Sequence, residues 1–359
     1  PLPTPVLAFA TNELSCDVGI MVTASHNPPQ DNGYKVYLGG TVDGIEYRGS
    51  QIVSPTDVSI AHKIDAITSL KEQPRAKVWT VLGEEIIEKY IECTASLATT
   101  PGTLKIVYTA MHGVGTETLQ RVFQKAGYPS PILVAAQAAP DPNFPTVAFP
   151  NPEEPGAIDL ALETAKTFDA DLVIANDPDA DRCAAAVKDP VTGWRMLRGD
   201  ELGAILGESI ARKSSDGIFA NSIVSSSILK KIAGHYNLEF KETLTGFKWI
   251  AAAIREQEGK GRFVVGGEES YGYMIGDAVR DKDAVAAACL ICEMAHSAQR
   301  EGLDMLGRLE RIHRNHGAYL EALVSQTKQG RAGKREIAEQ METFRSNPPA
   351  KFGDERVVE

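Results

Sequence analysis

The chain has 359 residues, of which 43% are hydrophobic, and it carries 37 lysines and arginines against 48 aspartates and glutamates, a formal net charge of −11. This length suffices for two or three globular domains with sizeable cores. The negative charge argues against nucleic acid as a partner, and no stretch of sequence approaches the roughly 18 apolar residues that a membrane span requires.

The first hundred residues are predicted to form one α/β unit. The apolar run 17–23 predicts a buried strand, and Pro28 and Pro29 enforce a loop after it. Ser25 therefore stands at a strand end, where a side chain is presented rather than packed. The other elements predicted here are a strand at 34–38, which carries Lys35, and helices from Ser54 or Thr56 to about Leu70 and from about Gly83 to Leu97.

A second unit begins after Pro101-Gly102. The turn His112-Gly113-Val114-Gly115 precedes a helix, and it fits equally a phosphate bound at the helix start or close packing of strand against helix. Six prolines between 140 and 155 predict a largely extended segment. The remaining elements predicted here are strands at 104–109 and 171–175, helices at 116–127, 157–168 and 200–213, and a hairpin of 183–187 with 194–197.

A third unit begins near Gly217. Its predicted elements are strands at 218–221 and 262–265 and helices at 225–236, 249–258 and 284–300, followed after residue 311 by a more polar region with a helix at about 334–345. The alternation of strand and helix predicts consecutive α/β domains with parallel or mixed sheets. We place the domains at 1–100, 101–215 and 216–310, with 311–359 as a linker and the start of a fourth domain that is largely absent.

The cysteines indicate a reducing compartment, and hence a cytoplasmic location. Five of them are spread along the chain, an odd and sparse set that does not suit a disulfide framework. Cys289 and Cys292 lie in an alanine-rich helical run and are predicted to be core residues rather than zinc ligands. No signal peptide is visible, and the chain starts at Pro1 without Met, so its first residue need not be that of the natural product.

One short segment carries most of the chemistry. Asn176-Asp177-Pro178-Asp179-Ala180-Asp181-Arg182 directly follows a predicted strand. Because alternate side chains of an extended segment point the same way, Asp177, Asp179 and Asp181 are predicted to converge on one hard cation. Three carboxylate oxygens suit Mg²⁺, which keeps positions for water or a phosphate oxygen. Arg182 adds a planar donor suited to phosphate, so an anionic ligand is expected nearby.

Plainer interpretations compete with this one. Asp and Pro favour turns, so a polar turn after the strand is the first alternative. A calcium loop of the EF-hand type fits less well, since Arg182 and Lys188 stand where it needs glycine and glutamate. Taken singly, six further residues would be ordinary turn, loop or surface positions: Ser25, His26, Lys35, Lys282, Glu268 and Ser270.

Three motifs together carry a family resemblance. Thr23-Ala24-Ser25-His26-Asn27-Pro28, Asp177-Pro178-Asp179-Ala180-Asp181-Arg182 and Gly267-Glu268-Glu269-Ser270 follow one another in this order. With them the chain resembles, over nearly its whole length, the α-D-phosphohexomutases of the phosphoglucomutase/phosphomannomutase group. The segments 31–37 and 243–249 look closest to its phosphoglucomutase and phosphopentomutase branch.

The resemblance implies a role for each motif. Ser25 matches the phosphoserine that gives and takes the phosphoryl group, and its phosphate joins Asp177, Asp179 and Asp181 as a ligand of Mg²⁺. Glu268 and Ser270 match residues that hold sugar hydroxyls, whereas Thr245, Gly246 and Lys248 match a loop that faces the sugar. Arg182 is suited to share the phosphate charge. General acid–base work is assigned in this family to lysine or histidine, and the matching candidates are His26, Lys35 and Lys282, left unranked.

The implied reaction interconverts a sugar 1-phosphate with its 6-phosphate or 5-phosphate. It passes through phosphoserine and a bisphosphate intermediate, with glucose 1,6-bisphosphate as activator and a phosphorylated sugar as the partner molecule. The alternatives are a phosphopentomutase, a catalytically weak fragment that still binds Mg²⁺ and sugar phosphate, and a metal-dependent phosphohydrolase.

The chain also departs from the family pattern. The family has four domains, and this sequence resembles it without the first half of domain one and without nearly all of domain four, whose Arg-Ser-Gly-Thr-type loop clamps the non-transferring phosphate. Each lost charge-assisted hydrogen bond costs about 1.5–3 kcal/mol, so losing two or three weakens substrate binding by roughly 10²–10⁵. We therefore expect a complete-looking transfer centre with a poor phosphate anchor.

Overall fold

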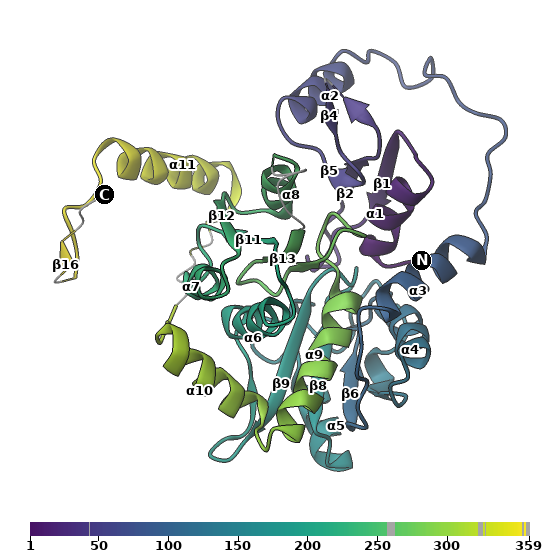
Figure 1. Cartoon of the computed structure of the whole chain (residues 1–359). Coiled ribbons are helices and arrows are strands. Elements are labelled where there is room, and N and C mark those ends of the chain that lie inside the picture. The colour runs from purple at the N-terminus through teal and green to yellow at the C-terminus, as the bar shows by residue number, and fades with distance from the viewer. Residues whose placement is uncertain (43, 257–262, 322–325, 327, 354, 357–359) are drawn as a thin grey trace. The chain divides into compact units, whose positions relative to one another are not determined.

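The structure is a computed structural model that describes residues 1–359 except 43, 257–262, 322–325, 327, 354 and 357–359 (Figure 1). It divides into two compact units, Pro1–Tyr319 and Leu320–Glu359. The larger unit holds sheets of three, five and four strands and a small ribbon of β3 (Thr41–Val42) with β4 (Ile45–Glu46).

The three-stranded sheet is antiparallel, in the order β1 (Val18–Val22), β2 (Tyr34–Leu38) and β5 (Ser50–Gln51). The prediction of a strand at 17–23 is right, but its predicted burial is wrong. Val18, Ile20 and Val22 are 49%, 57% and 81% exposed. Only the other face of this edge strand is covered, where Gly19 lies against α1 (Thr4–Glu13).

The described part of the first hundred residues forms three helices, whereas we predicted two. They are α1, α2 (Thr56–Asp65) and α3 (Glu84–Ala95). We did not predict α1, because prolines dominate its start. Pro5 sits in its first turn, where a missing N–H has no cost. The second helix ends five residues before the predicted Leu70, and none of its residues is buried, so no packing extends it.

The five-stranded sheet has the order β10-β9-β8-β6-β7. Its strands are β6 (Ile106–Thr109), β7 (Ile132–Leu133), β8 (Leu172–Asn176), β9 (Cys183–Asp189) and β10 (Gly193–Met196), and its helices are α4 (Gly115–Ala126), α5 (Asp159–Phe168) and the single 3₁₀ turn Ala135–Gln137. Because β6 and β8 are neighbours and parallel, their carboxyl ends deliver the glycine-rich turn and the Asp-rich segment to the same edge (Figure 1). The predicted hairpin of β9 and β10 is confirmed.

The four-stranded sheet has the order β12-β11-β13-β14, and only β14 runs antiparallel to its neighbour. Its strands are β11 (Ile218–Ser222), β12 (Glu239–Thr243), β13 (Phe263–Gly267) and β14 (Tyr273–Ile275), with helices α6 (Gly199–Ala211), α7 (Ile228–His235) and α8 (Phe247–Arg255). We did not predict β12, because its sequence Glu-Phe-Lys-Glu-Thr is that of a polar edge strand. The predicted ends at 258 and 262 lie outside the described residues.

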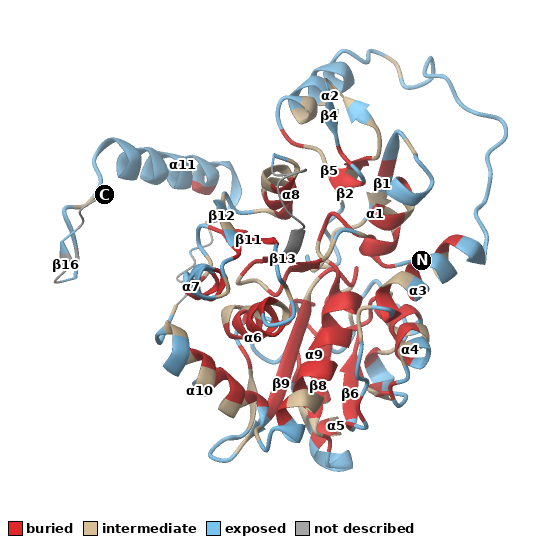
Figure 2. Cartoon of the chain, in the orientation of Figure 1, coloured by how far each residue is buried: buried red, intermediate tan, exposed pale blue. Residues whose placement is uncertain are grey.

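Helix α9 (Ala284–Arg300) joins the two larger sheets. It contacts β8 and β9 of one sheet and β14 of the other, and its residues are buried along most of its length (Figure 2). Cys289 and Cys292 are free and buried within it, as predicted for core residues. No helix among the described residues has both the length and the apolar character to cross a membrane.

Two further segments differ from the prediction. Helix α10 (Met305–His316) was missed in a polar stretch, although its buried residues Met305, Leu309 and Ile312 recur at helical spacing. Residues 140–155 form successive turns rather than an extended segment, because proline fixes φ at a value that turns accept as well. The second unit contains α11 (Gly330–Ser346), which includes the predicted helix, and the ribbon β15 (Lys351–Phe352) with β16 (Glu355–Arg356).

Asp283 caps the N-terminus of α9, and its ionisation should make the free energy of unfolding depend on pH. Its carboxylate accepts hydrogen bonds from the backbone N–H groups of Val285 and Ala286 and from the Tyr90 hydroxyl. Burial raises the pKa of Asp283 to about 6. Because this pKa is about 4 in an unfolded chain, the folded state holds the extra proton, and stability falls by roughly 3 kcal/mol as pH rises from about 4 to about 6.

Asp283→Asn should flatten that part of the pH profile. Urea unfolding of both proteins at intervals between pH 4 and 7 measures the difference. Identical pH profiles for parent and variant would contradict the assignment.

Candidate active site

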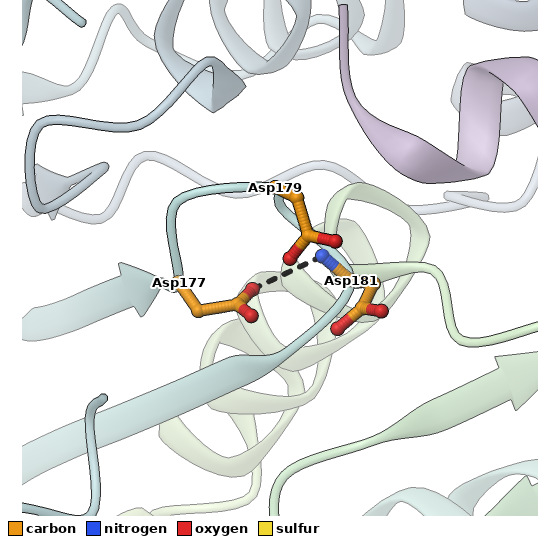
Figure 3. A group of neighbouring side chains, drawn as sticks. All are labelled: Asp177, Asp179 and Asp181. Carbon is orange, nitrogen blue, oxygen red and sulfur yellow. Dashed lines mark hydrogen bonds between the residues drawn. The ribbon is translucent and has the colours of Figure 1, made fainter. Parts of the chain in front are cut away.

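The Asp-rich segment after β8 forms a tight turn. Ala180 has a φ of 54° and donates its N–H to the Asp177 carbonyl at 2.9 Å. Asp177 Oδ1 accepts the backbone N–H of Asp181 at 3.1 Å, as Figure 3 shows, and the backbone N–H of Arg182 at 2.9 Å. The three carboxylates therefore converge as predicted, but the expected extended spacing is wrong and the turn brings them together. One oxygen from each lies within 4.8 Å of the others, and all three residues are buried.

Carboxylate and ammonium groups meet at this turn, residues 177–182, which we call the Asp turn. Asp181 Oδ2 lies 2.5 Å from Lys35 Nζ and 3.1 Å from Lys282 Nζ, and Lys35 Nζ also lies 2.7 Å from Asp179 Oδ2. The other oxygen of Asp181, Oδ1, is buried and has no hydrogen-bond partner within the described chain. Three converging carboxylates, one with an unpartnered buried oxygen, fit a hard divalent ion.

Ser25 lies against this turn. Its Oγ is 2.9 Å from Asp179 Oδ1 and 3.3 Å from Asp177 Oδ2. Its φ of 55° is a left-handed value that serine seldom adopts, and such strain clusters at functional sites. His26 follows, with Nδ1 3.3 Å from the serine Oγ. A cavity of about 370 Å³, lined by Ser25 and Asp179 among others, opens beside the hydroxyl.

The ionisation of these groups follows from their surroundings. Burial and then the Arg182 charge lower the pKa of His26 to about 4. Burial opposes the charge of Lys35, but the carboxylates of the Asp turn outweigh it and raise the pKa of Lys35 well above its usual value. Burial, with two like charges beside it, raises the pKa of Asp177 well above its usual value.

The loop that follows β13 contacts the end of the Asp turn. The backbone of Arg182 forms a β-bridge with that of Gly272, and the Arg182 guanidinium lies 3.6 Å from Glu153. Glu268 Oε1 accepts the N–H of Gly246 at 2.6 Å, so the two predicted sugar-facing segments touch each other. Burial raises the pKa of Glu268, against the opposing effect of the nearby Lys282.

Three predicted residues are not joined to this cluster. Thr245 is exposed, Ser270 is half-buried, and the Lys248 ammonium lies 5.6 Å from the centre of the Trp249 ring. Within the described part of the chain, no hydrogen bond or ion pair connects their side chains to the Asp turn. Their proposed contacts to a sugar therefore remain predictions.

The sequence analysis missed two residues that shape the site. The buried Thr4 donates its hydroxyl to Asp179 Oδ2 at 2.8 Å and its N–H to the Asp179 carbonyl at 2.9 Å. Nothing in the sequence marks it, since threonine at a helix start is common. Asp281 contacts Lys282 and Tyr37. The charged run 280–283 did signal it, but only the lysine was considered.

Comparison with known proteins agrees with this arrangement. Residues 1–68, 86–193 and 198–311 match the family models described as phosphoglucomutase/phosphomannomutase, alpha/beta/alpha domains I, II and III. A Haemophilus influenzae protein named "Probable phosphomannomutase" is 43% identical over 364 residues, which cover 100% of this chain and 72% of that protein. The chain belongs to the phosphoglucomutase/phosphomannomutase family.

Other members of the family are similar to the chain as well. A Mus musculus phosphopentomutase is 36% identical over 345 residues, covering 89% of this chain and 54% of its own length. The solved structure of a phosphoglucomutase/phosphomannomutase family protein from Burkholderia thailandensis has the same fold, with a TM-score of 0.70 at 22% identity, covering 87% of this chain and 63% of that one. The predicted family and α/β fold are confirmed, and the chain spans between 54% and 72% of these relatives.

The glycine-rich turn of this chain packs closely against the Asp-rich segment, a contact that its sequence did not predict. A Cβ on Gly113 would lie 2.3 Å from the Pro178 Cα, and the Val114 N–H donates to the Pro178 carbonyl at 2.8 Å. The backbone of the glycine-rich turn therefore supports the backbone of the Asp-rich segment.

Gly113→Ala should displace the Asp turn. Because the obstructing atoms are backbone, we expect a loss of about 1–3 kcal/mol in unfolding free energy and weaker binding of a divalent cation at the Asp turn. Gly234→Ala is the matched control, since a Cβ there meets nothing within 4 Å. Urea unfolding and Mg²⁺ titration measure both effects, and a Gly113→Ala protein equal to Gly234→Ala in both would refute the packing role.

Proposed function

We propose that the chain carries the transfer centre of a phosphosugar mutase, which interconverts a sugar 1-phosphate with its 6-phosphate or 5-phosphate. The placement of Ser25 supports this most strongly. Its hydroxyl hydrogen-bonds to Asp179 and Asp177, about 150 positions along the chain, at distances of 2.9 and 3.3 Å. A hydroxyl beside carboxylates that could hold a cation, with two ammonium groups at the same turn, has surroundings that suit phosphoryl transfer.

Asp177, Asp179 and Asp181 are proposed to hold Mg²⁺, with the phosphate of phosphorylated Ser25 as a further ligand. When bound, the ion neutralises charge on the transferring phosphoryl group. Lys35 and Lys282 contribute further positive charge at Asp181. Arg182 is proposed to bind phosphate oxygens, for which its planar guanidinium is suited.

The transfer itself is an exchange of two P–O bonds. A sugar hydroxyl attacks the phosphorus on Ser25, and the bond from phosphorus to Oγ breaks as the bond to the sugar oxygen forms. The hydroxyl proton passes to whichever of His26, Lys35 and Lys282 is uncharged, and a protonated member of the same three supplies the proton that Ser25 Oγ takes up. The bisphosphate then turns over, and its other phosphoryl group returns to Ser25. Glucose 1,6-bisphosphate is the proposed activator because it can phosphorylate the serine directly.

The sugar is proposed to bind opposite the Asp turn. Glu268 and Ser270 would hold its hydroxyls, since a carboxylate and a hydroxyl suit a vicinal diol. The loop of Thr245, Gly246 and Lys248 would face the ring. In this scheme residues 1–100 carry the serine, 101–215 the metal ligands and 216–310 the sugar loop.

A pentose phosphate is the second candidate substrate, because a phosphopentomutase is among the relatives. Incubation with Mg²⁺, glucose 1,6-bisphosphate and either glucose 1-phosphate or ribose 1-phosphate, followed by ³¹P NMR, tests both. A mutase forms the 6- or 5-phosphate without steady release of inorganic phosphate. Steady release would indicate a phosphohydrolase instead, and binding without any product would indicate a sugar-phosphate-binding fragment.

A further inference from the structure

Asp281 is a buried carboxylate to which the scheme above gives no role. It lies between β14 and α9 and is 1% exposed. Its Oδ2 accepts the Tyr37 hydroxyl at 2.6 Å and the Gln51 side-chain amide at 2.7 Å, and its Oδ1 accepts the backbone N–H of Lys282 at 2.8 Å. One side chain therefore binds partners more than 200 positions away.

These partners belong to the sheet that carries Lys35. Tyr37 on β2 and Gln51 on β5 are directly paired across the two strands. Lys35 precedes Tyr37 by two residues, so both side chains lie on the same face of β2. Asp281 thus fastens the segment of Lys282 to the strand of Lys35, and the two ammonium groups meet at Asp181 Oδ2.

The Lys282 side chain has little freedom. Its Nζ lies 3.1 Å from Asp181 Oδ2, 3.8 Å from Asp281 Oδ1 and 5.3 Å from the centre of the Phe247 ring. On the stem, even a Cβ on Gly272 would come within 2.4 Å of the lysine Cδ. These neighbours form a narrow slot that confines the aliphatic stem of Lys282, and the carboxylates of Asp181 and Asp281 hold its ammonium group.

Asp281 is an anion in this setting. Burial opposes its charge, but the nearby Lys282 and Lys35, together with its hydrogen bonds, lower the pKa of Asp281 below its ordinary value. It therefore partly neutralises the two lysines beside the Asp turn.

We infer that Asp281 is a positioning residue that holds the Lys282 ammonium at Asp181 and keeps the Lys282 segment in register with the strand of Lys35. Its value to catalysis rests on the proposed function, in which Lys282 is a candidate for proton transfer. If Asp281 only stabilised the loop, its replacement would expose all the nearby side chains alike. If Asp281 is a positioning residue, its replacement should change mainly the exposure and the chemistry of Lys282.

Competitive acetylation with acetic anhydride tests the positioning without any activity. In Asp281→Asn, labelling of Lys282 should rise by about fivefold or more, because the ammonium is released from its slot. The exposed Lys125 and Lys188 should keep their labelling. Asp283→Asn is the matched control, since Asp283 is also buried and also accepts a tyrosine hydroxyl.

If Asp281→Asn does not fold, Tyr37→Phe is a less disruptive variant for the same acetylation experiment. It removes one donor and leaves the carboxylate, so a rise of about twofold at Lys282 is expected. Unchanged labelling of Lys282, or an equal rise at Lys282, Lys125 and Lys188, would overturn the inference.

A double-mutant cycle on the rate of Ser25 phosphorylation tests the link to catalysis. Asp281→Asn should slow the rate by about 10–100-fold in the parent and by little in a Lys282→Gln background. Equal slowing in both backgrounds would assign Asp281 a structural role only. If the parent itself takes up no phosphoryl group, the proposed function fails, while the acetylation result still decides whether Asp281 positions Lys282.

Discussion

Replacing Ser25 by alanine should abolish phosphoryl transfer by this chain. The hydroxyl is the only group proposed to carry the phosphoryl group between the two halves of the reaction, so its loss should lower the rate by at least about 10³-fold. The variant should still fold, because the serine hydroxyl contacts the edge of the Asp turn and the neighbouring His26 rather than the hydrophobic core. Exchange of ³²P between glucose 1,6-bisphosphate and glucose 1-phosphate measures the rate.

Ser59→Ala on α2 is the control for this substitution, since Ser59 is exposed and belongs to no part of the site. It should exchange ³²P at the parental rate. Exchange by Ser25→Ala at more than a few per cent of the parental rate would mean that another residue carries the phosphoryl group.

Asp181→Asn should destabilise the metal-free chain and remove its response to Mg²⁺. The parent Asp181 partners two ammonium groups, of Lys35 and Lys282, that are only 17% and 13% exposed. Because Lys35 keeps Asp179 and Lys282 keeps Asp281, the loss should be smaller than the about 3–5 kcal/mol of a buried charge left with no partner. Mg²⁺ at about 100 times its dissociation constant should stabilise the parent by about 2.7 kcal/mol. Urea unfolding with and without Mg²⁺ measures both effects.

The control here is Asp159→Asn, which removes an exposed carboxylate on α5. It should keep nearly all the parental stability and the full Mg²⁺ response. Should Asp181→Asn respond to Mg²⁺ as strongly as Asp159→Asn, the Asp turn would not be the metal site.

Sequence patterns sufficed for the elements whose burial is uniform. Strands β6 and β8 are wholly buried, and their apolar runs predicted them within two residues at each end. The polar strand β12 and the polar helix α10 were missed, because tertiary contacts rather than their own composition stabilise them. The same limit explains β1, whose apolar residues predicted burial although one face is exposed.

The site was predictable where chemistry is concentrated in short motifs. The three carboxylates, Ser25 and Lys282 were singled out from these motifs and lie together in the structure, although the extended spacing assumed for the carboxylates was wrong. The contacts of Thr4 with Asp179 and of Tyr37 with Asp281 span 175 and 244 positions. No local pattern encodes such pairs, so only the fold reveals them.

The most direct test of the account is the intact mass of the chain before and after incubation with glucose 1,6-bisphosphate and Mg²⁺, followed by peptide mapping. The account predicts a gain of one phosphoryl group, located on Ser25 and absent when Mg²⁺ is removed. A folded chain that binds Mg²⁺ yet gains no phosphoryl group, or gains it on another residue, would contradict the assignment of Ser25 and the Asp turn as a phosphoryl-transfer centre.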